Sequence, residues 1–380
     1  FVIIYSYYSF SRAFLKDFWT NTPVMDVFPS EVYPSIDAID HSPDGKLAIG
    51  SSKLTGRYWN GSLWLFKTPD QAPDSIYAPD NKHCSCCAST NAGCTDLTWL
   101  DEKRLAFASD NGVIELWCVG ESFNEVEILA NLTGHDDIVQ SISVNCDRIK
   151  IVSGSLDMSI RVWDLEREAC TDTFQGHSDA VYGVCFRQEE QEIFASASED
   201  GSIVLWDLRN DKPARRLLNS SHHLAAPLCL TWDQSGNYLA IGYKDGSVSC
   251  YDVRNVGQPQ VKRKPHCRDV NAVAFCPKRP SWLASVSNDC VVNILDLDAS
   301  QSCYQNNDHK DFVRDLSWSP VDGCLRTCGW DTQIIRHTPT MIEEGMDTKV
   351  NKTVALETSV IARVGCNGII STVNKSNLIE

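Results

Sequence analysis

The sequence of 380 residues has no run dominated by Lys or Arg, and its formal net charge is −16. A nucleic-acid footprint is therefore not indicated, and we expect no direct nucleic-acid partner. Long apolar runs are missing as well. The apolar residues 1–10 are too few to cross a bilayer, so we expect no membrane association. We expect residues 1–22 to form a flexible terminal segment, with a signal peptide as the alternative.

Motifs of common enzymes are also missing. The sequence has no Gly-rich phosphate-binding loop, and no pair of carboxylates stands out as an acid–base couple. We therefore expect a protein without enzymatic activity and without a cofactor. The acidic charge favours basic partners, because opposite charge speeds their encounter.

What the sequence does contain is a repeat. The segment "KIVSGSLDMSIRVWDL" (150–165) returns as "IFASASEDGSIVLWDL" (193–208), with weaker copies on both sides. One anchor position marks each copy, at spacings of 42 to 51 residues. The anchor residues are Phe66, Trp117, Trp163, Trp206, Tyr251, Leu295 and His337. A period of this length, ending in Trp-Asp, is typical of one blade of a β-propeller.

A His element completes the pattern. "GHDDIV" (134–139) and "GHSDAV" (176–181) precede short apolar strands, and "HCRDV" (266–270) and "HKDFV" (309–313) are their relatives. The chain resembles the WD-repeat family on these motifs. The resemblance implies an all-β fold, a seven-bladed propeller over residues 23–338, and a tail of residues 339–380 that is an extra strand or disordered.

The ring must close by adding an outer strand to blade 7, because an open edge is exposed to pairing. We expect the segment around Met25–Tyr33 to supply this strand, and the C-terminal segment is the alternative.

Ser, His and Asp recur together, which suggests a hydrolase triad. The set appears in two blades at matched spacing and without a nucleophile motif, so we interpret it as a buried polar network. The network residues are His135, Ser153, Asp157 and Trp163 in one blade, and His177, Ser196, Asp200 and Trp206 in the next.

The segment "HCSCCASTNAGC" suggests a metal site. Its candidate ligands are His83, Cys84, Cys86, Cys87 and Cys94, and their spacing, C-x-C-C-x6-C, makes the two well-directed CxxC pairs that zinc prefers awkward. We interpret the segment as a mobile loop between blades 1 and 2 with reduced thiols, and we expect no metal. The 17 cysteines, many of them in apolar runs, indicate a reducing compartment.

"WDLR" (206–209) and "YDVR" (251–254) resemble the motif by which some WD-repeat proteins bind the adaptor of a cullin ubiquitin ligase. The resemblance implies that Arg209 and Arg254 would contact that adaptor. A substrate receptor of a cullin ligase is therefore the alternative function.

The turn of blade 1 is lengthened to "GSSKLTGRYWNGS", and "CGWD" in blade 7 places Trp330 just before the turn Asp331. Arg, Tyr and Trp are enriched among interface hot spots. Blades 7 and 1 are neighbours in a closed ring, so Trp59 and Trp330 are predicted to lie on one face. Either tryptophan can instead cover its own blade.

"LTGRYWNGSLWLFK" and "HKDFVRDLSWSP" with "GWDTQIIRH" are similar to the family of methylosome WD-repeat subunits. These proteins are cofactors of the type II protein arginine methyltransferase, which dimethylates arginine symmetrically. The resemblance implies a non-catalytic scaffold that presents basic, Arg-rich substrates such as histones and Sm proteins, in the cytoplasm and the nucleus. The residues expected to contact the methyltransferase are Lys53, Leu54, Arg57, Tyr58, Trp59 and Trp330.

Overall fold

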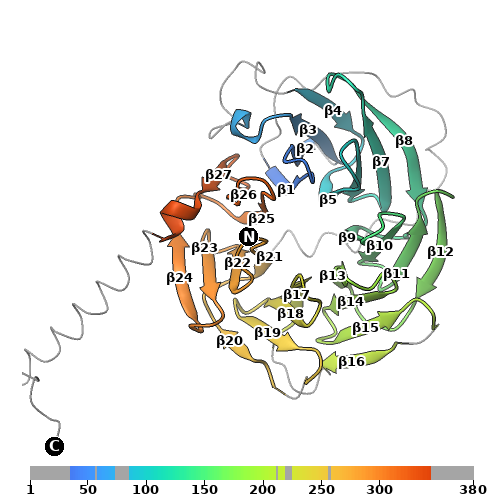
Figure 1. Cartoon of the computed structure of the whole chain (residues 1–380). Helices are drawn as coiled ribbons and strands as arrows, with labels where there is room; N and C mark the ends of the chain where they lie inside the picture. The colour runs from blue at the N-terminus through green and yellow to red at the C-terminus, as the bar shows by residue number, and fades with distance from the viewer. Residues whose placement is uncertain are drawn as a thin grey trace, which may run out of the picture.

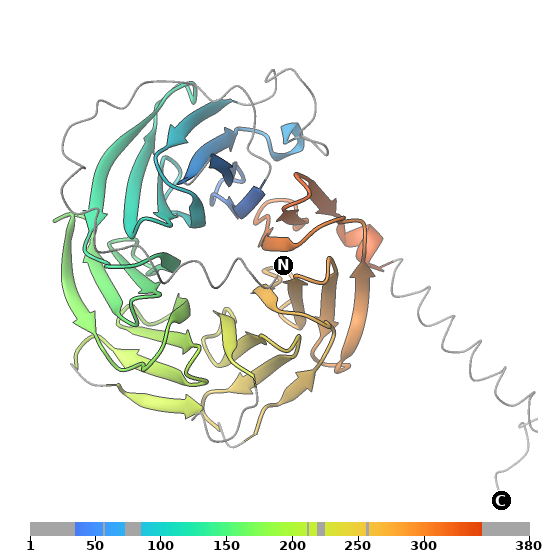
Figure 2. The same cartoon turned by 180° about the vertical axis from the view of Figure 1, so that it is seen from behind.

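The computed structural model describes residues 35–55, 58–72, 85–210, 213–218, 225–255 and 258–343. In these residues 27 strands form seven antiparallel sheets, which stand around a central axis as the blades of a propeller (Figures 1 and 2). The predicted all-β, seven-bladed fold is confirmed. No helix within these ranges is long and apolar enough to cross a membrane.

Each blade is a meander in which the first strand lies innermost. The innermost strands are β1 (Ser35–His41), β5 (Cys94–Trp99), β9 (Val139–Val144), β13 (Val181–Phe186), β17 (Pro227–Trp232), β21 (Val270–Phe275) and β25 (Val313–Trp318). The second strands are β2 (Leu47–Thr55), β6 (Arg104–Ser109), β10 (Lys150–Ser155), β14 (Ile193–Ser198), β18 (Tyr238–Tyr243), β22 (Trp282–Ser287) and β26 (Leu325–Gly329). The third strands are β3 (Tyr58–Phe66), β7 (Val113–Val119), β11 (Ile160–Asp164), β15 (Ile203–Asp207), β19 (Val248–Asp252), β23 (Val292–Asp296) and β27 (Ile334–His337). The outermost strands of blades 1 to 6 are β4 (Cys86–Thr90), β8 (Val126–Thr133), β12 (Ala169–Phe174), β16 (Arg215–Leu218), β20 (Val261–Arg263) and β24 (Gln301–Asn306).

The core lies between the blades. Each sheet is packed on both faces, so second strands such as β10 and β14 are buried along nearly their whole length. Trp206 of blade 4, for example, shares one apolar cluster with Val152 and Val162 of blade 3. Packing on both faces explains why third strands such as β15 are continuous apolar runs instead of alternating ones.

The seven anchor residues all lie on third strands, and each pairs with the residue at one equivalent position of the second strand. Trp163 pairs with Ile151 and Trp206 pairs with Phe194, and the other five pairs follow the same register. The repeat in the sequence is therefore a repeat of strand register.

A β-bulge shifts the register near the start of the innermost strand in all seven blades. A bulge leaves one residue without a ladder partner and turns its side chain. Asp37 occupies this position in β1, and Arg314 occupies it in β25.

Carboxylates of the innermost strands join neighbouring blades. The Ile39 N–H donates to Asp315 at 2.9 Å, and the Trp99 N–H donates to Asp40 at 3.0 Å. These bonds connect blade 7 to blade 1 and blade 1 to blade 2. Burial raises the pKa of Asp40 to about 6 and that of Asp315 to about 7, although backbone hydrogen bonds lower both.

The interpretation of the Cys-rich segment as a loop was wrong. Cys86 and Cys87 lie in β4, the outermost strand of blade 1, and Cys94 begins β5, the innermost strand of blade 2. The apolar character of the thiols explains the difference, because β4 packs into the core between blades 1 and 2 through the buried Cys86. His83 and Cys84 lie outside the described residues.

Blade 7 has three strands among the described residues, and helical residues 339–343 follow β27. The segment Met25–Tyr33, predicted to complete this blade, lies outside the described residues. The same is true of residues 1–22 and of the tail beyond residue 343.

Candidate functional site

The hairpin of blade 1 is the feature that distinguishes this blade. β2 and β3 each run for nine residues, whereas the second and third strands of blade 4 run for six and five. Pairing continues to Leu54↔Trp59 and Thr55↔Tyr58. The extra residues, which the sequence analysis placed on a turn, are therefore strand residues.

Strand propensity explains this extension. Thr, Tyr and Trp favour strands, so these residues pair across the hairpin and prolong it as a two-stranded ribbon. The side chain of Tyr58, and Arg57 altogether, lie outside what the structure describes, so their predicted roles stay predictions.

The ribbon presents an apolar pair. Leu54 and Trp59 are directly opposite each other, so their side chains stand on the same side of the ribbon. Leu54 is 54% exposed, the second highest value among the large apolar residues that are exposed in the described chain. Trp59 and Lys53 are half-buried. An apolar pair with one largely exposed member is suited to a protein partner.

The base of the ribbon is packed closely against blade 2. A carbon added to Gly93 would lie 3.2 Å from both Trp59 Cβ and Ser52 Oγ. The absence of a side chain at Gly93 therefore lets Trp59 approach the segment that leads into β5.

The side chain of Trp330 packs against residues of its own chain. Its Nε1–H donates to the carboxylate of Asp37 at 2.8 Å, and its ring lies 5.5 Å from that of Phe312. The guanidinium of Arg314 stands over the ring at 5.4 Å. The half-buried indole thus covers its own blade and bridges to β1. Its predicted contact with a methyltransferase stays a prediction.

The two tryptophans lie on one face of the ring. The Ser52 hydroxyl beside Trp59 accepts from the Cys94 N–H at 2.9 Å and also bonds to Asp37, which binds Trp330. Burial raises the pKa of Asp37, and the charge of Arg314 and these two hydrogen bonds oppose the shift. A continuous set of hydrogen bonds therefore joins Ser52 of the hairpin to Trp330 across the junction of blades 7, 1 and 2.

The predicted polar network is assembled in blade 3. His135 lies 2.8 Å from Asp157 and 2.7 Å from Ser153 Oγ, and the Trp163 indole donates to the same hydroxyl at 2.8 Å. Burial raises the pKa of Asp157, but hydrogen bonds from His135 and Ser159 outweigh it and hold the pKa well below its usual value. Ser153 is fully buried, so a substrate cannot reach its hydroxyl.

Blade 4 repeats the arrangement. His177 lies 3.1 Å from Asp200 and 2.7 Å from Ser196, to which Trp206 donates at 2.8 Å. Burial lowers the pKa of His177, which keeps the imidazole neutral. In both blades the set connects the loop before the innermost strand to the turn between the second and third strands.

Blades 6 and 7 contain the same connection, which the sequence analysis did not assign to residues. His266 bonds to Asp289 and Ser285, and His309 bonds to Asp331 and Thr327. The relatives of the His element at 266–270 and 309–313 were the signal for it.

Arg209 and Arg254 are exposed, and each forms a forked pair with the Asp of its own motif. Arg209 donates to Asp207 at 2.6 and 2.7 Å, and Arg254 donates to Asp252 at 2.7 and 2.8 Å. These hydrogen bonds lower the pKa of both carboxylates. A ligase adaptor would therefore have to compete with an internal carboxylate at either position.

Two cysteines of the Cys-rich segment, Cys86 and Cys94, are buried. Burial raises the pKa of Cys86 to about 11 and that of Cys94 well above its usual value. Metal ligation needs the thiolate, so both residues act as small apolar side chains. In the ranges that the structure describes, no three His, Cys, Asp or Glu side chains are grouped to hold a metal ion.

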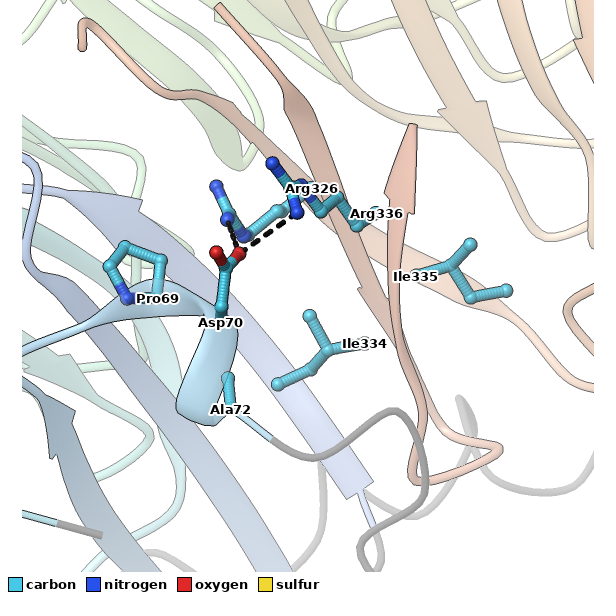
Figure 3. Close-up of a pocket in the computed structure, with 7 residues that line it drawn as sticks. All are labelled: Pro69, Asp70, Ala72, Arg326, Ile334, Ile335 and Arg336. Atoms are coloured by element: carbon cyan, nitrogen blue, oxygen red, sulfur yellow. Dashed lines mark hydrogen bonds and ion pairs between the residues drawn. The ribbon is translucent and has the colours of Figure 1, made fainter. Parts of the chain in front are cut away.

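A pocket of about 340 Å³ lies between blade 1 and blade 7, beside the 3₁₀ turn η2 (Pro69–Gln71) (Figure 3). Arg326 of β26 and Arg336 of β27 converge on the carboxylate of Asp70, at 3.0 and 3.1 Å (Figure 3). Arg326 is buried and also donates to His41 Nε2 at 3.0 Å. Burial and then the charge of Arg326 lower the pKa of His41 to about 3, so this imidazole is a neutral acceptor.

The sequence analysis missed this cluster, because Asp70 and Arg326 are 256 positions apart and belong to no motif. The cluster joins the last blade to the first through charged hydrogen bonds. Its arginines are already occupied by Asp70 and Asp322, so it contributes to ring closure.

Comparison with known proteins agrees with this architecture. The family "WD domain, G-beta repeat" matches residues 126–164, 168–207 and 215–252. The chain is 35% identical to "Methylosome protein WDR77" of Xenopus laevis over 81% of its own length and 91% of the relative. It is 28% identical to "GATOR2 complex protein WDR24" of Homo sapiens over 60% of its length, which spans 30% of that relative. It is 26% identical to the "F-box/WD-40 repeat-containing protein At5g21040" of Arabidopsis thaliana over 56% of its length and 40% of that relative.

Proposed function

The chain belongs to the family of methylosome WD-repeat proteins that includes the Xenopus WDR77, and from this premise we propose that it is the non-catalytic subunit that binds a type II protein arginine methyltransferase. The observation that carries the proposal is the prolonged hairpin of blade 1. It presents Leu54 and Trp59 side by side, at a place where the hairpin of blade 4 is short.

The hairpin suits an interface for two physical reasons. A two-stranded ribbon is held by its ladder, so its side chains are ordered before the partner arrives, which lowers the entropy lost on binding. Trp is among the residue types that contribute most to binding free energy, and Leu54 supplies apolar area beside it. Lys53 and Arg57 would add charged contacts at the rim of the interface.

The substrates that we propose are basic and Arg-rich, such as histones and Sm proteins. The formal net charge of −16 gives the scaffold a long-range attraction for such chains, which raises the rate of encounter. We place the complex in the cytoplasm and the nucleus, in agreement with the many reduced cysteines.

The alternative function is that of a substrate receptor on a cullin ubiquitin ligase, docked through Arg209 and Arg254. Both guanidiniums are engaged by Asp207 and Asp252, so docking would exchange one carboxylate for another with little net gain. The hairpin of blade 1 needs no such exchange, and this difference favours the methyltransferase.

The test is co-purification of the full chain with the type II methyltransferase from the same source. Trp59→Ala should weaken the complex by at least about 2 kcal/mol, because it removes a partly exposed aromatic anchor. Leu54→Ala should weaken it less. Leu129→Ala is the matched control, since Leu129 is 46% exposed on the outermost strand of blade 2.

Thermal melting of each free variant serves as the folding control. Equal weakening by Leu54→Ala and Leu129→Ala would remove the hairpin as the docking element. Failure of the wild-type chain to bind the methyltransferase would overturn the proposal, and Arg209→Ala would then be tested against a ligase adaptor.

A further inference from the structure

Two neighbouring blades carry an unusual concentration of positive charge at their outer edges. The outermost strand of blade 4, β16, begins with Arg215 and Arg216, and that of blade 5, β20, ends in Lys262 and Arg263, followed by Lys264. All five side chains are exposed. Figures 1 and 2 show β16 and β20 as the outermost strands of two neighbouring blades, on the far side of the ring from blade 1. We name these five residues the basic strip.

The strip is exceptional among the outer edges. The outermost strands of blades 1, 2, 3 and 6 contain no Lys or Arg at all. Charged side chains on an edge strand discourage pairing with another chain. That need applies to every outer strand, so it does not explain why the cations gather on only two of them.

Within the described part of the chain none of the five residues of the strip forms an ion pair, whereas the neighbouring Arg209 and Arg254 are each paired with an Asp. The positive charges of Lys264 and Lys262 favour the ionised form of Asp245 without a direct ion pair. Burial raises the pKa of that carboxyl, but hydrogen bonds from Ser247 and then the two lysine charges hold it below its usual value.

The arginines of the strip are positioned in advance. Arg215 donates to the carbonyl of Val253 at 3.4 Å, which carries it across to blade 5. Arg263 donates to the carbonyl of Ser300 in blade 6 at 2.7 Å, and Arg216 donates to Gly176 at 2.6 Å. A guanidinium has five N–H donors, so each of these keeps donors for a carboxylate.

We propose that the basic strip is a docking surface for an acidic, extended segment of a partner protein. Its side chains would pair with the Asp and Glu residues of that segment through charge-assisted hydrogen bonds. The strip is remote from the hairpin of blade 1, so an acidic segment and a partner on blade 1 can bind together. The proposal is independent of the proposed function.

A nucleic acid fits the surface less well. Single-stranded nucleic acids bind through aromatic stacking platforms, and no aromatic residue is among the large apolar side chains that are exposed in the described chain. The net charge of −16 also repels a long polyanion, whereas a short acidic segment meets only the local field of the strip.

The test uses a fluorescein-labelled decaglutamate and the full chain, with binding followed by fluorescence anisotropy at 50 and 300 mM salt. The strip variant is Arg215→Gln/Lys262→Gln/Lys264→Gln. The matched control is Lys103→Gln/Arg167→Gln/Lys310→Gln, which removes the same charge from other exposed sites. Both variants should melt close to the wild type, because surface substitutions of this kind change stability little.

We expect the wild type to bind decaglutamate at low salt and to lose most of this binding at high salt. The strip variant should bind at least tenfold more weakly, and the control should stay within twofold. Absence of wild-type binding at 50 mM salt, or equal losses in both variants, would overturn the proposal. Tighter binding of a labelled decauridylate than of decaglutamate, lost in the strip variant, would assign the strip to nucleic acid and overturn it too.

Discussion

The indole of Trp330 donates its N–H to the carboxylate of Asp37, which lies 2.8 Å away and 293 positions earlier in the chain. This bond crosses the junction at which the last blade meets the first. Asp37 is the bulge residue of the innermost strand of blade 1, so the bulge turns its carboxylate toward blade 7. The joint of the ring is therefore built from side chains on the same face as the hairpin of blade 1.

The contribution of this bond can be measured with Trp330→Phe. The variant keeps a ring between Phe312 and Arg314 but removes the donor to Asp37. We expect a loss of about 1–3 kcal/mol in the free energy of unfolding, because a buried carboxylate loses a partner. Urea unfolding checks it. In a double-mutant cycle with Asp37→Ala, which removes the acceptor, the two losses should not add, and additive losses would show that the bond contributes nothing.

The charged cluster at the joint leads to a second prediction. Arg326→Met removes a guanidinium that is 2% exposed and that serves both Asp70 and His41. We expect a loss of about 1–3 kcal/mol in the free energy of unfolding, because the change leaves the buried Nε2 of His41 without a donor. Arg336→Met is the matched control. It faces the same Asp70 from a position 40% exposed, so it should cost less than about 1 kcal/mol. Equal losses of unfolding free energy in the two variants would show that the burial of Arg326 does not affect its contribution.

A third prediction concerns pH. Glu115 of β7 is buried and accepts from the Trp117 indole at 3.1 Å. Burial raises its pKa from 4.5 to about 7, although the hydrogen bond from Trp117 opposes the shift. A carboxyl whose pKa is raised by folding contributes stability below the unfolded value, and this stability is lost as the pH rises through the folded value.

The wild type should therefore lose stability relative to Glu115→Gln as the pH rises from about 4.5 to about 7, by up to about 3 kcal/mol. The side-chain amide of Glu115→Gln keeps an oxygen that accepts from Trp117 and cannot ionise, so this variant is matched to the wild type. Chemical unfolding of both proteins at pH 4.5, 5.5, 6.5 and 7.5 gives the difference. A difference that does not change with pH would show that the carboxyl titrates normally.

Much of the fold could be predicted from short stretches of sequence. The spacing of the anchor residues from Phe66 to His337 predicts the blades, because strands, tight turns and the His–Asp connection are encoded within about one repeat. Each anchor lies in a third strand as expected. The Ser153 and Ser196 networks follow from the same local pattern, since every member lies within one blade.

Local reasoning failed where a side chain's surroundings come from another blade. The Cys-rich segment reads as a loop in isolation, but Cys86 gains a buried place only when β4 packs against blade 2. The pairing of Leu54 with Trp59 was missed for a different reason. It lies within blade 1, but it depends on the strand register, which decides which side chains share a side of the ribbon.

The sequence alone is enough to establish the repeat and the number of blades. These depend on hydrophobic pattern and turn chemistry over some forty residues. The folded ring adds what its closure brings together, which is Trp330 with Asp37 and Arg326 with Asp70. Contacts between residues so far apart depend on the position of whole blades, and no short pattern in the sequence records them.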